Sequence, residues 1–323
     1  DRMHALVRSA VFQAAIFARR SFDGGRVTLL NYHRFPAQQA AGFRRQCEYL
    51  RERCRVIPMS QLSASLRDGR RLPTHAAVIT VDDGHRDFYT CAYPILREFK
   101  LTAVMYLPTA FLDGAWLWFD RYQYIFDRSP CERAECRGMA PLGDGALDLS
   151  SRDARYRAFL EVARQAQWLP AAERDRLGDR LADLLRVSVP ERPQEEFAPL
   201  RWDEVREMAS NGIEFGGHTV THPILQTLPS AEDLAEEIAG CKRRIEEELQ
   251  APLRHFAYPS GKAEEVPGVA KEAVARAGFE TAVTTLPGQV GPGDDPLWLR
   301  RIGTDPGVDL LWFRRCAAAV MAG

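Results

Sequence analysis

Residues Ile79–Phe88 read ITVDDGHRDF, with two carboxylates, Asp82 and Asp83, directly after an apolar, β-branched run and directly before Gly84. Adjacent acids repel each other, and their place at the end of a predicted strand has two interpretations. Asp and Gly both favour turns, so the pair can simply close the strand. Because successive side chains of a strand point in opposite directions, the two acids can instead have separate functions around one cation.

Apolar runs alternate along the chain with stretches of helical periodicity, which is typical of βα units. The predicted strands are Arg26–His33, Ala76–Asp83, Thr102–Pro108, Ile213–Thr219, His255–Pro259 and Thr281–Thr285. A helix is predicted over Phe43–Cys54, and a second one begins where Ser230 and Asp233 form a capping pair. The pattern therefore predicts an α/β fold.

The segment of about 113–200 interrupts this alternation. It is rich in Arg, Glu and Asp, and Leu177, Leu181 and Leu184 repeat at helical spacing, whereas Ser129–Asp148 favours a loop. We predict a mostly helical insertion between two strands of a single domain that spans 25–315. Residues 1–24 are predicted as a separate amphipathic helix that covers part of the core or lies on a membrane face.

Composition excludes some classes of function. The chain carries 43 Lys and Arg against 44 Asp and Glu, so its charge does not favour a nucleic-acid partner. Charged and polar residues interrupt every long apolar run, and no membrane-spanning helix is expected. Seven scattered cysteines indicate a reducing, cytoplasmic compartment, with an exported form that has lost a signal as the alternative. Oligomeric state is left open.

A second group of polar residues stands in GGHTVTHP, where His218 and His222 are four residues apart. Two imidazoles at this spacing on one face of a helical turn can reach the same metal ion. With one carboxylate they make a two-His, one-Asp set that leaves positions open for water and substrate, as catalytic zinc sites require. The spacing alone is weak evidence, which the acid pair strengthens.

Three motifs in order, TVDDG (Thr80–Gly84), HTVTHP (His218–Pro223) and FAYPSG (Phe256–Gly261), resemble those of the polysaccharide deacetylases. These are the NodB-homology enzymes of carbohydrate esterase family 4. The similarity runs from LLNYHRF near residue 30 to LWLRRIG near residue 300, apart from the insertion. It implies a distorted (β/α)7-type barrel and hydrolysis of N-acetyl groups on amino sugars of a polysaccharide, oligosaccharide or glycoconjugate.

The resemblance also implies roles for the motif residues. It implies one divalent metal ion, zinc first and cobalt or nickel as alternatives, bound by Asp83, His218 and His222. Asp82 is then the general base toward the water that the metal activates. In the loop Tyr258, Pro259 and Ser260, the Ser260 N–H is the implied donor to the developing oxyanion, with an ordinary tight turn as the alternative.

The sequence departs from the family pattern at two places. Ala257 stands where many members carry an Arg that orients the base, and Arg301 is the implied substitute, with neighbouring Arg300 as the alternative. No His follows His255, so the usual general acid near the C-terminus is missing. His33 at the end of the first predicted strand is the candidate acid, by its similarity to a branch with an early Tyr-His pair; a structural His is the alternative.

Other polar and aromatic residues have less specific interpretations. His4, His75, His85 and His255 are predicted to be surface or packing residues. The aromatic residues of WLWFDRYQY favour core packing, although one of them can floor a sugar groove. Two rival functions stay open: a non-catalytic carbohydrate-binding protein on the same fold, and a metal amidohydrolase that acts on a non-sugar amide.

Overall fold

The computed structural model describes residues 25–318 of the 323-residue chain, so the N-terminal helix predicted for 1–24 lies outside the described residues. The helices and strands, in chain order, are β1 (Val27–Tyr32), α2 (Ala40–Arg53), β2 (Arg55–Val56), α3 (Met59–Arg67), β3 (Ala76–Val81), α4 (Tyr93–Phe99), β4 (Val104–Leu107), α5 (Thr109–Leu112), α6 (Trp118–Arg128), β5 (Arg133–Met139), β6 (Gly143–Asp148), α7 (Arg152–Ala166), α8 (Ala171–Leu184), α9 (Trp202–Ser210), β7 (Glu214–Gly217), α10 (Ala231–Leu249), β8 (His255–Ala257), α11 (Gly268–Arg276), β9 (Thr281–Pro287), β10 (Leu299–Gly303) and α12 (Leu310–Ala318). Short 3₁₀ or π turns cover Ala37–Gln39, Phe88–Ala92, Glu195–Phe197, Leu225–Thr227 and Ala263–Glu265.

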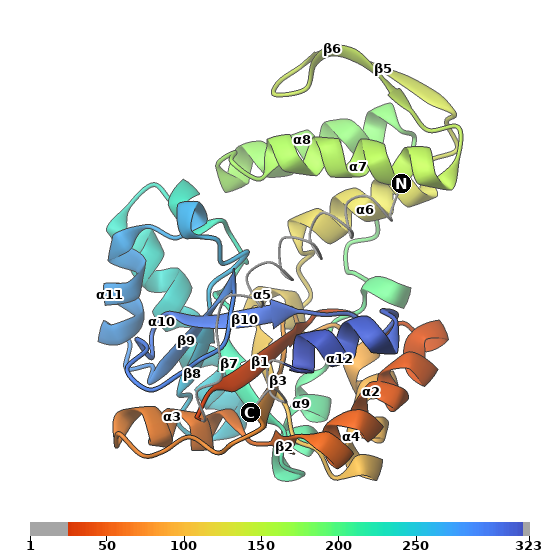
Figure 1. Ribbon diagram of the computed structural model, residues 1–323. Helices are drawn as coiled ribbons and strands as arrows, with labels where there is room; N and C mark the ends of the chain where they lie inside the picture. The colour runs from red at the N-terminus through yellow and green to blue at the C-terminus, as the bar shows by residue number, and fades with distance from the viewer. Residues whose placement is uncertain (1–24, 319–323) are drawn as a thin grey trace.

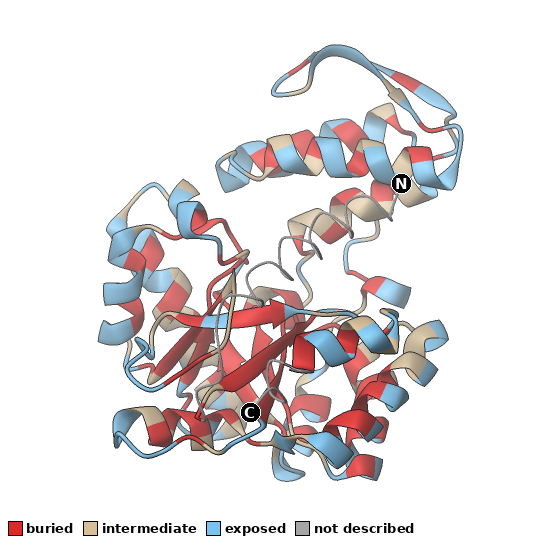
Figure 2. Ribbon diagram, in the orientation of Figure 1, coloured by how far each residue is buried: buried red, intermediate tan, exposed pale blue. Residues whose placement is uncertain are grey.

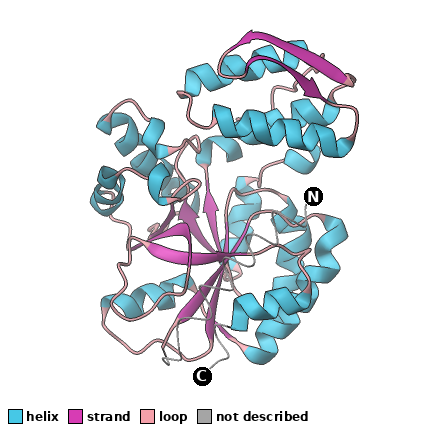
Figure 3. Ribbon diagram, turned by 45° about the horizontal axis from the view of Figure 1, so that its top comes forward, coloured by secondary structure: helices cyan, strands magenta, loops and turns pink. Residues whose placement is uncertain are grey.

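Seven parallel strands of the described chain close into a barrel in the order β1-β10-β9-β8-β7-β4-β3 (Figure 1). Closure occurs at β1, which pairs with β10 on one side and with β3 on the other. The short β2 adds to β3 outside the ring. Helices surround the strands (Figure 3). The predicted distorted (β/α)7-type barrel is confirmed.

Strand side chains alternate between two apolar clusters, as the period of two requires. Val27, Leu29, Val78 and Tyr106 belong to a cluster inside the barrel, which Met59 and Leu62 of α3 close at one end. The intervening residues of the same strands pack outward against the helices in a larger cluster. Figure 2 shows the strands as almost entirely buried, because both of their faces are covered.

The strand predictions succeed where apolar runs are long. Each of the six predicted strands overlaps an observed one, with β9 extending two residues beyond its predicted end, and Ser230 caps α10 by accepting a hydrogen bond from the Asp233 N–H at 3.0 Å. The sequence does not predict β2 or β10. β10 carries the adjacent Arg300 and Arg301, which interrupt its apolar pattern, although Arg301 is buried inside the barrel.

The segment from α6 to α8 packs as a unit over one end of the barrel (Figures 1 and 3). Its three helices and the β5–β6 hairpin share their own apolar cluster. The loop predicted for Ser129–Asp148 is wrong, because most of this stretch is the antiparallel hairpin. Buried Ala134 and Cys136 alternate with exposed residues there, but the glycines at 138, 143 and 145 hide this short pattern in the sequence.

No helix within residues 25–318 is both long and apolar enough to cross a membrane. All seven cysteines are free thiols, including Cys131 and Cys136, which stand close together in the sequence.

Gly216 lies in β7, two residues before His218, and allows this strand to lie close to its neighbours. A Cβ at this position would lie 2.4 Å from Cδ1 of Tyr106 and 2.7 Å from the backbone oxygen of His255. We expect Gly216→Ala to lower the free energy of unfolding by roughly 1–3 kcal/mol, because an overpacked core must shift. Urea denaturation measures this change. The matched control is Gly145→Ala in β6, where a Cβ meets nothing within 4 Å; an equal effect in both variants would contradict the packing interpretation.

Candidate metal and catalytic site

The sequence-predicted site residues meet at one rim of the barrel. His33 follows β1, Asp82 and Asp83 follow β3, His218 follows β7, and the loop 258–261 follows β8. In a parallel barrel the carboxyl ends of all strands lie on the same rim, and loops there converge. Residues that are up to about two hundred positions apart in the sequence are thereby brought together.

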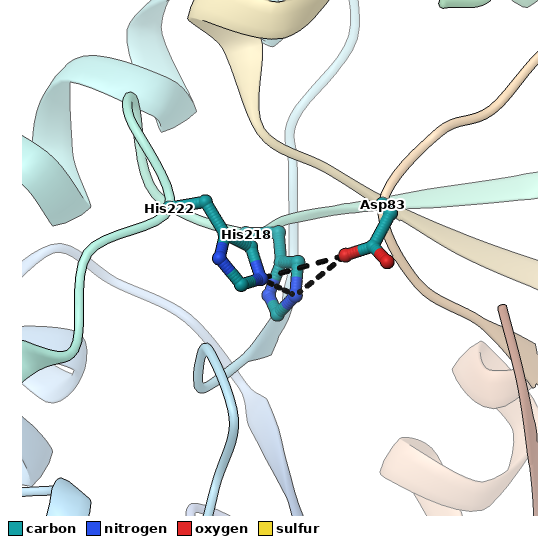
Figure 4. A group of neighbouring side chains, drawn as sticks. All are labelled: Asp83, His218 and His222. Carbon is teal, nitrogen blue, oxygen red and sulfur yellow. Dashed lines mark hydrogen bonds and ion pairs between the residues drawn. The ribbon is translucent and has the colours of Figure 1, made fainter. Parts of the chain in front are cut away.

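Asp83, His218 and His222 form a buried triad (Figure 4). The Asp83 Oδ1 atom lies 3.6 Å from His218 Nε2 and 3.4 Å from His222 Nε2, and the two Nε2 atoms lie 3.1 Å apart. The three ligand atoms are all within 4.8 Å of one another. They are the carboxylate and the two imidazoles that the sequence predicts as one set.

The donor chemistry of this triad fits a divalent cation. His218 Nδ1 lies 2.8 Å from the Ala257 carbonyl oxygen and donates its hydrogen there, which leaves the Nε2 lone pair facing Asp83 and His222. Burial, reinforced by His222, lowers the pKa of His218 to about 4, so this imidazole is neutral near pH 7. The Asp83 oxygen and the two Nε2 atoms are the donor atoms that a divalent cation such as zinc prefers, and three protein ligands leave positions open.

The loop that presents the two histidines is not the helical turn predicted from their spacing. Thr219 and His222 both have positive φ, 67° and 56°, and the segment between them has no helical hydrogen bonds. Thr219 Oγ1 accepts a hydrogen bond from the His222 N–H, and Glu237 of α10 accepts from the N–H groups of Val220 and Thr221. These side-chain acceptors replace a helix in holding the rings face to edge.

Asp83 also has an unusual backbone, with φ of 75°, followed by Gly84 at 73°. This left-handed turn at the strand end directs the Asp83 carboxylate to the imidazoles. Burial acts to raise the pKa of Asp83, but the hydrogen bond and charge of His222 outweigh it and hold the pKa well below the ordinary value. Asp83 is therefore ionised at neutral pH.

Asp82 points to a different partner, the guanidinium of Arg301 on β10. The two groups form two parallel hydrogen bonds of 2.7 Å, from Nη1 to Oδ1 and from Nη2 to Oδ2. Both side chains are buried, at 2% and 1% exposure. Burial acts to raise the pKa of Asp82, and the charge of Arg301 together with its hydrogen bonds lowers it below the ordinary value. The adjacent acids thus have separate environments.

Arg301 is held on all sides inside the barrel. Its Nε donates to the Thr284 carbonyl at 2.8 Å, and Nη1 also donates to Asn31 Oδ1 at 2.9 Å. Arg300, the alternative left open by the sequence, is exposed. The structure therefore places Arg301, and not Arg300, beside Asp82.

His33 lies at the open side of the same carboxylate. Its Nε2 atom is 3.8 Å from Asp82 Oδ2, and the imidazole is 49% exposed. A structural His would bond to a loop backbone, but no such hydrogen bond of His33 is present in the described residues. The His33 imidazole is therefore exposed to solvent on one side and close to the Asp82 carboxylate on the other.

The loop after β8 contains one residue that anchors it and one backbone N–H without a partner among the described residues. The Tyr258 N–H donates to the Val283 carbonyl, and its buried phenol donates to the Leu297 carbonyl at 3.0 Å, so Tyr258 anchors the loop. Ser260, with φ of 60°, offers its carbonyl to the Thr285 hydroxyl, and its N–H makes no hydrogen bond between residues 25 and 318. Pro259 precedes this open donor. The rim at β8 therefore has a free backbone N–H.

Two residues of α6 contact the triad and its loop: Phe119, one of the aromatic residues predicted for core packing or a sugar-groove floor, and Asp120, which the sequence does not single out. Phe119 packs edge-on against His222 at 5.3 Å, and Asp120 lies 2.7 Å from His85 Nε2. Both His85 and Asp120 are buried, so the prediction that His85 is a surface or packing residue holds only for packing. The only signal was the acid inside the aromatic run WFDRY, which packing explains equally well.

A family model described as "Polysaccharide deacetylase" matches residues 175–282, which include His218 and His222. Over 72 residues, 22% of this chain, the sequence is 38% identical to the poly-beta-1,6-N-acetyl-D-glucosamine N-deacetylase of Escherichia coli (strain K12). That aligned stretch spans only 11% of the length of the Escherichia coli protein.

Solved structures share the fold over most of the chain. IcaB from Ammonifex degensii matches with a TM-score of 0.58 at 20% identity, over 92% of this chain and 98% of that one. The Streptococcus pyogenes deacetylase PplD, solved in complex with acetate, matches with a TM-score of 0.57 at 18% identity, over 88% of this chain and 95% of that one. At such identities the likeness shows the common barrel.

Removing one triad ligand should abolish stoichiometric metal binding. We expect His222→Ala to lose it, because two remaining ligands cannot hold the ion in a three-ligand site. Titration of the chelator-treated protein with zinc or cobalt measures this. His33→Ala is the control, since His33 contacts Asp82 and not the triad; equal binding by His222→Ala and the parent would contradict the assignment.

Arg301→Met should destabilise the metal-free protein by about 3–5 kcal/mol at pH 7, because it leaves the Asp82 charge buried and unpaired. In the parent, the lowered pKa of Asp82 stabilises the fold above the unfolded Asp pKa of about 3.9, and this contribution is lost as pH falls. In the variant the pKa of Asp82 rises and protonation relieves the cost. The difference in unfolding free energy should therefore shrink from pH 7 toward pH 4.

Urea denaturation at several pH values gives these free energies. Arg300→Met, a change at the exposed neighbour, is the matched control and should stay within about 0.5 kcal/mol of the parent. A difference between Arg301→Met and the parent that does not depend on pH would contradict the charge-pair account.

Proposed function

We propose that this chain, which belongs to the polysaccharide deacetylase family, is a metal-dependent hydrolase that removes N-acetyl groups from amino sugars of a polysaccharide, oligosaccharide or glycoconjugate. One observation carries the proposal. Two adjacent acids separate their functions, Asp83 facing two imidazoles and Asp82 paired with Arg301 at its side. The name of the Escherichia coli relative supports an N-acetylated sugar as substrate.

The divalent ion that Asp83, His218 and His222 would hold, zinc or alternatively cobalt or nickel, supplies Lewis acidity that activates water and polarises the acetyl carbonyl. Asp82 accepts the proton of the attacking water. The charge of Arg301 keeps Asp82 ionised and ready for this step, and the two parallel hydrogen bonds hold its orientation. The geometry of this step therefore depends on Asp82, which follows β3, and on Arg301 of β10. These two strands pair with β1 on its opposite sides.

The remaining steps use groups on the rim. The Ser260 N–H, which has no internal partner, donates to the oxyanion that forms on the acetyl oxygen. His33, in its protonated form, donates a proton to the departing amine, which is too basic to leave without one. The free amino sugar and acetate are the products.

The position of His33 favours catalysis over the non-catalytic binding alternative. A binding protein has no need of an exposed imidazole 3.8 Å from a buried carboxylate that an Arg keeps ionised. The alternative of a non-sugar amide substrate is a question of specificity, since the same groups act on any acetamide. A substrate panel decides between sugar and non-sugar amides.

Zinc- or cobalt-loaded protein should release acetate from N-acetylglucosamine oligomers, and Asp82→Asn should release it about 10²- to 10⁴-fold more slowly while binding metal normally. Enzymatic detection of acetate measures the rate. Asp179→Asn is the matched control, the same substitution at an exposed acid of the insertion. No release by the metal-loaded parent from a broad panel of acetylated sugars would contradict the proposal, and release only from non-sugar amides would favour the amidohydrolase.

The leaving group tests the role of His33. His33→Ala should slow hydrolysis of the amide far more than hydrolysis of an aryl acetate, because a phenolate leaves without protonation. Rates on both substrates, measured at equal metal content, give the comparison. Equal losses on amide and ester would show that His33 acts at some other step.

A further inference from the structure

The insertion contains a buried arginine whose guanidinium makes no hydrogen bond or ion pair with any of residues 25–318. Arg174 lies in the first turn of α8 and is only 3% exposed. Its Nε and Nη1 atoms are enclosed and make no hydrogen bond to any described residue. Nη2 makes none either, but unlike the other two nitrogens it is not enclosed. The guanidinium therefore has an accessible tip with unused donors directly behind it.

No acid contacts this guanidinium directly. Among residues 25–318, no carboxylate forms an ion pair with Arg174, and burial lowers its pKa although the charges of Asp175 and Glu237 act in the opposite direction. Asp175 is exposed, and Glu237 already accepts hydrogen bonds from the Val220 N–H, the Thr221 N–H and the Thr221 hydroxyl. A buried cation with unused donors is strongly destabilising, so Arg174 points to a partner outside the described residues, and an anionic group of the substrate can supply it.

A series of aromatic contacts joins this arginine to the metal triad. The guanidinium carbon lies 4.9 Å from the centre of the Trp118 ring, Trp118 lies 5.7 Å from Phe119, and Phe119 lies 5.3 Å from His222. Trp118 and Phe119 open α6, which leads from the barrel to α7 and α8 in Figure 1. Arg174 is therefore connected to His222 of the triad through two aromatic side chains of α6.

The contact with Trp118 is not sufficient to explain Arg174 as a structural residue. The Tyr122 hydroxyl donates to the Arg174 backbone oxygen at 2.7 Å, so α8 is attached to α6 without the guanidinium. Apolar residues such as Leu177 and Leu181 bury the same helix face. A neutral, apolar side chain would cover Trp118 without the cost of burying a charge.

We propose that Arg174 and Trp118 form a subsite that binds the carboxylate or phosphate of an acidic sugar, next to the N-acetyl sugar at the metal site. The guanidinium donates to the oxyanion through Nη2, the one of its three nitrogens that is not enclosed. Trp118 offers a ring against which a sugar packs. The inference rests on the proposed function for the neighbouring site, and it makes the preferred glycan an acidic one.

Binding tests this without turnover. In an Asp82→Asn background, calorimetry compares a neutral N-acetylglucosamine trisaccharide with two others in which one sugar carries a 6-carboxylate or a 6-phosphate. We expect the acidic trisaccharides to bind more tightly, and Arg174→Met to weaken their binding about 10- to 100-fold while leaving the neutral one unchanged. The two acidic ligands distinguish carboxylate from phosphate. Arg176→Met, at an exposed arginine of the same helix, is the matched control.

Stability separates the subsite from a structural role. Removing an unpaired buried charge should leave the melting temperature of Arg174→Met equal to the parent or higher, whereas a structural cation–π contact predicts a fall. If Arg174→Met does not fold, Arg174→Lys, which keeps the charge and loses the Nη2 donor, should still weaken acidic binding. Equal binding of neutral and acidic trisaccharides by the Asp82→Asn protein, or a preference that survives Arg174→Met, overturns the subsite. Failed acetate release by the parent overturns only the deacetylase proposal.

Discussion

The buried pair between Asp82 and Arg301 is the interaction on which the site depends. Two adjacent carboxylates at one strand end would repel each other and compete for the same cation. Arg301 removes this conflict because its guanidinium holds both oxygens of Asp82 inside the barrel. The left-handed backbone of Asp83 then turns the second carboxylate toward the imidazoles. One acid faces the two imidazoles, and the other is held apart from them by Arg301.

The pair between Asp82 and Arg301 also depends on closure of the barrel. Arg301 is on β10 and Asp82 follows β3, and β1 lies between them and pairs with both strands. Asn31 of β1 accepts a hydrogen bond from the same guanidinium. Closure of the ring therefore brings Asp82 and Arg301 together. A barrel that opened at β1 would separate Asp82 from Arg301 and leave two buried charges unpaired.

The insertion is part of the site and not only an addition to the barrel. Its first helix packs Phe119 on a triad histidine and places Asp120 on His85, two residues after Asp83. The chain then returns beside the same loop, where the Arg86 N–H donates to the Ala198 carbonyl. Both ends of the inserted segment thus hold the loop that carries Asp83. Arg174, the residue of the proposed acidic subsite, belongs to the same inserted segment.

The sequence by itself indicated the parallel α/β character and the order of the motifs, and it grouped Asp83 with His218 and His222, because long apolar strands and polar residues at their ends are local patterns. It also limited the expected partner of Asp82 to Arg300 or Arg301. Because these two residues are adjacent, the sequence did not choose between them. Only the tertiary structure decided between them, since alternation along β10 buries one and exposes the other. The loop geometry of His218 and His222, the β5–β6 hairpin and the contacts of Asp120 and Arg174 were likewise beyond the sequence. Each of these features depends on contacts with residues that are far away in the sequence, and no local sequence pattern indicates such contacts.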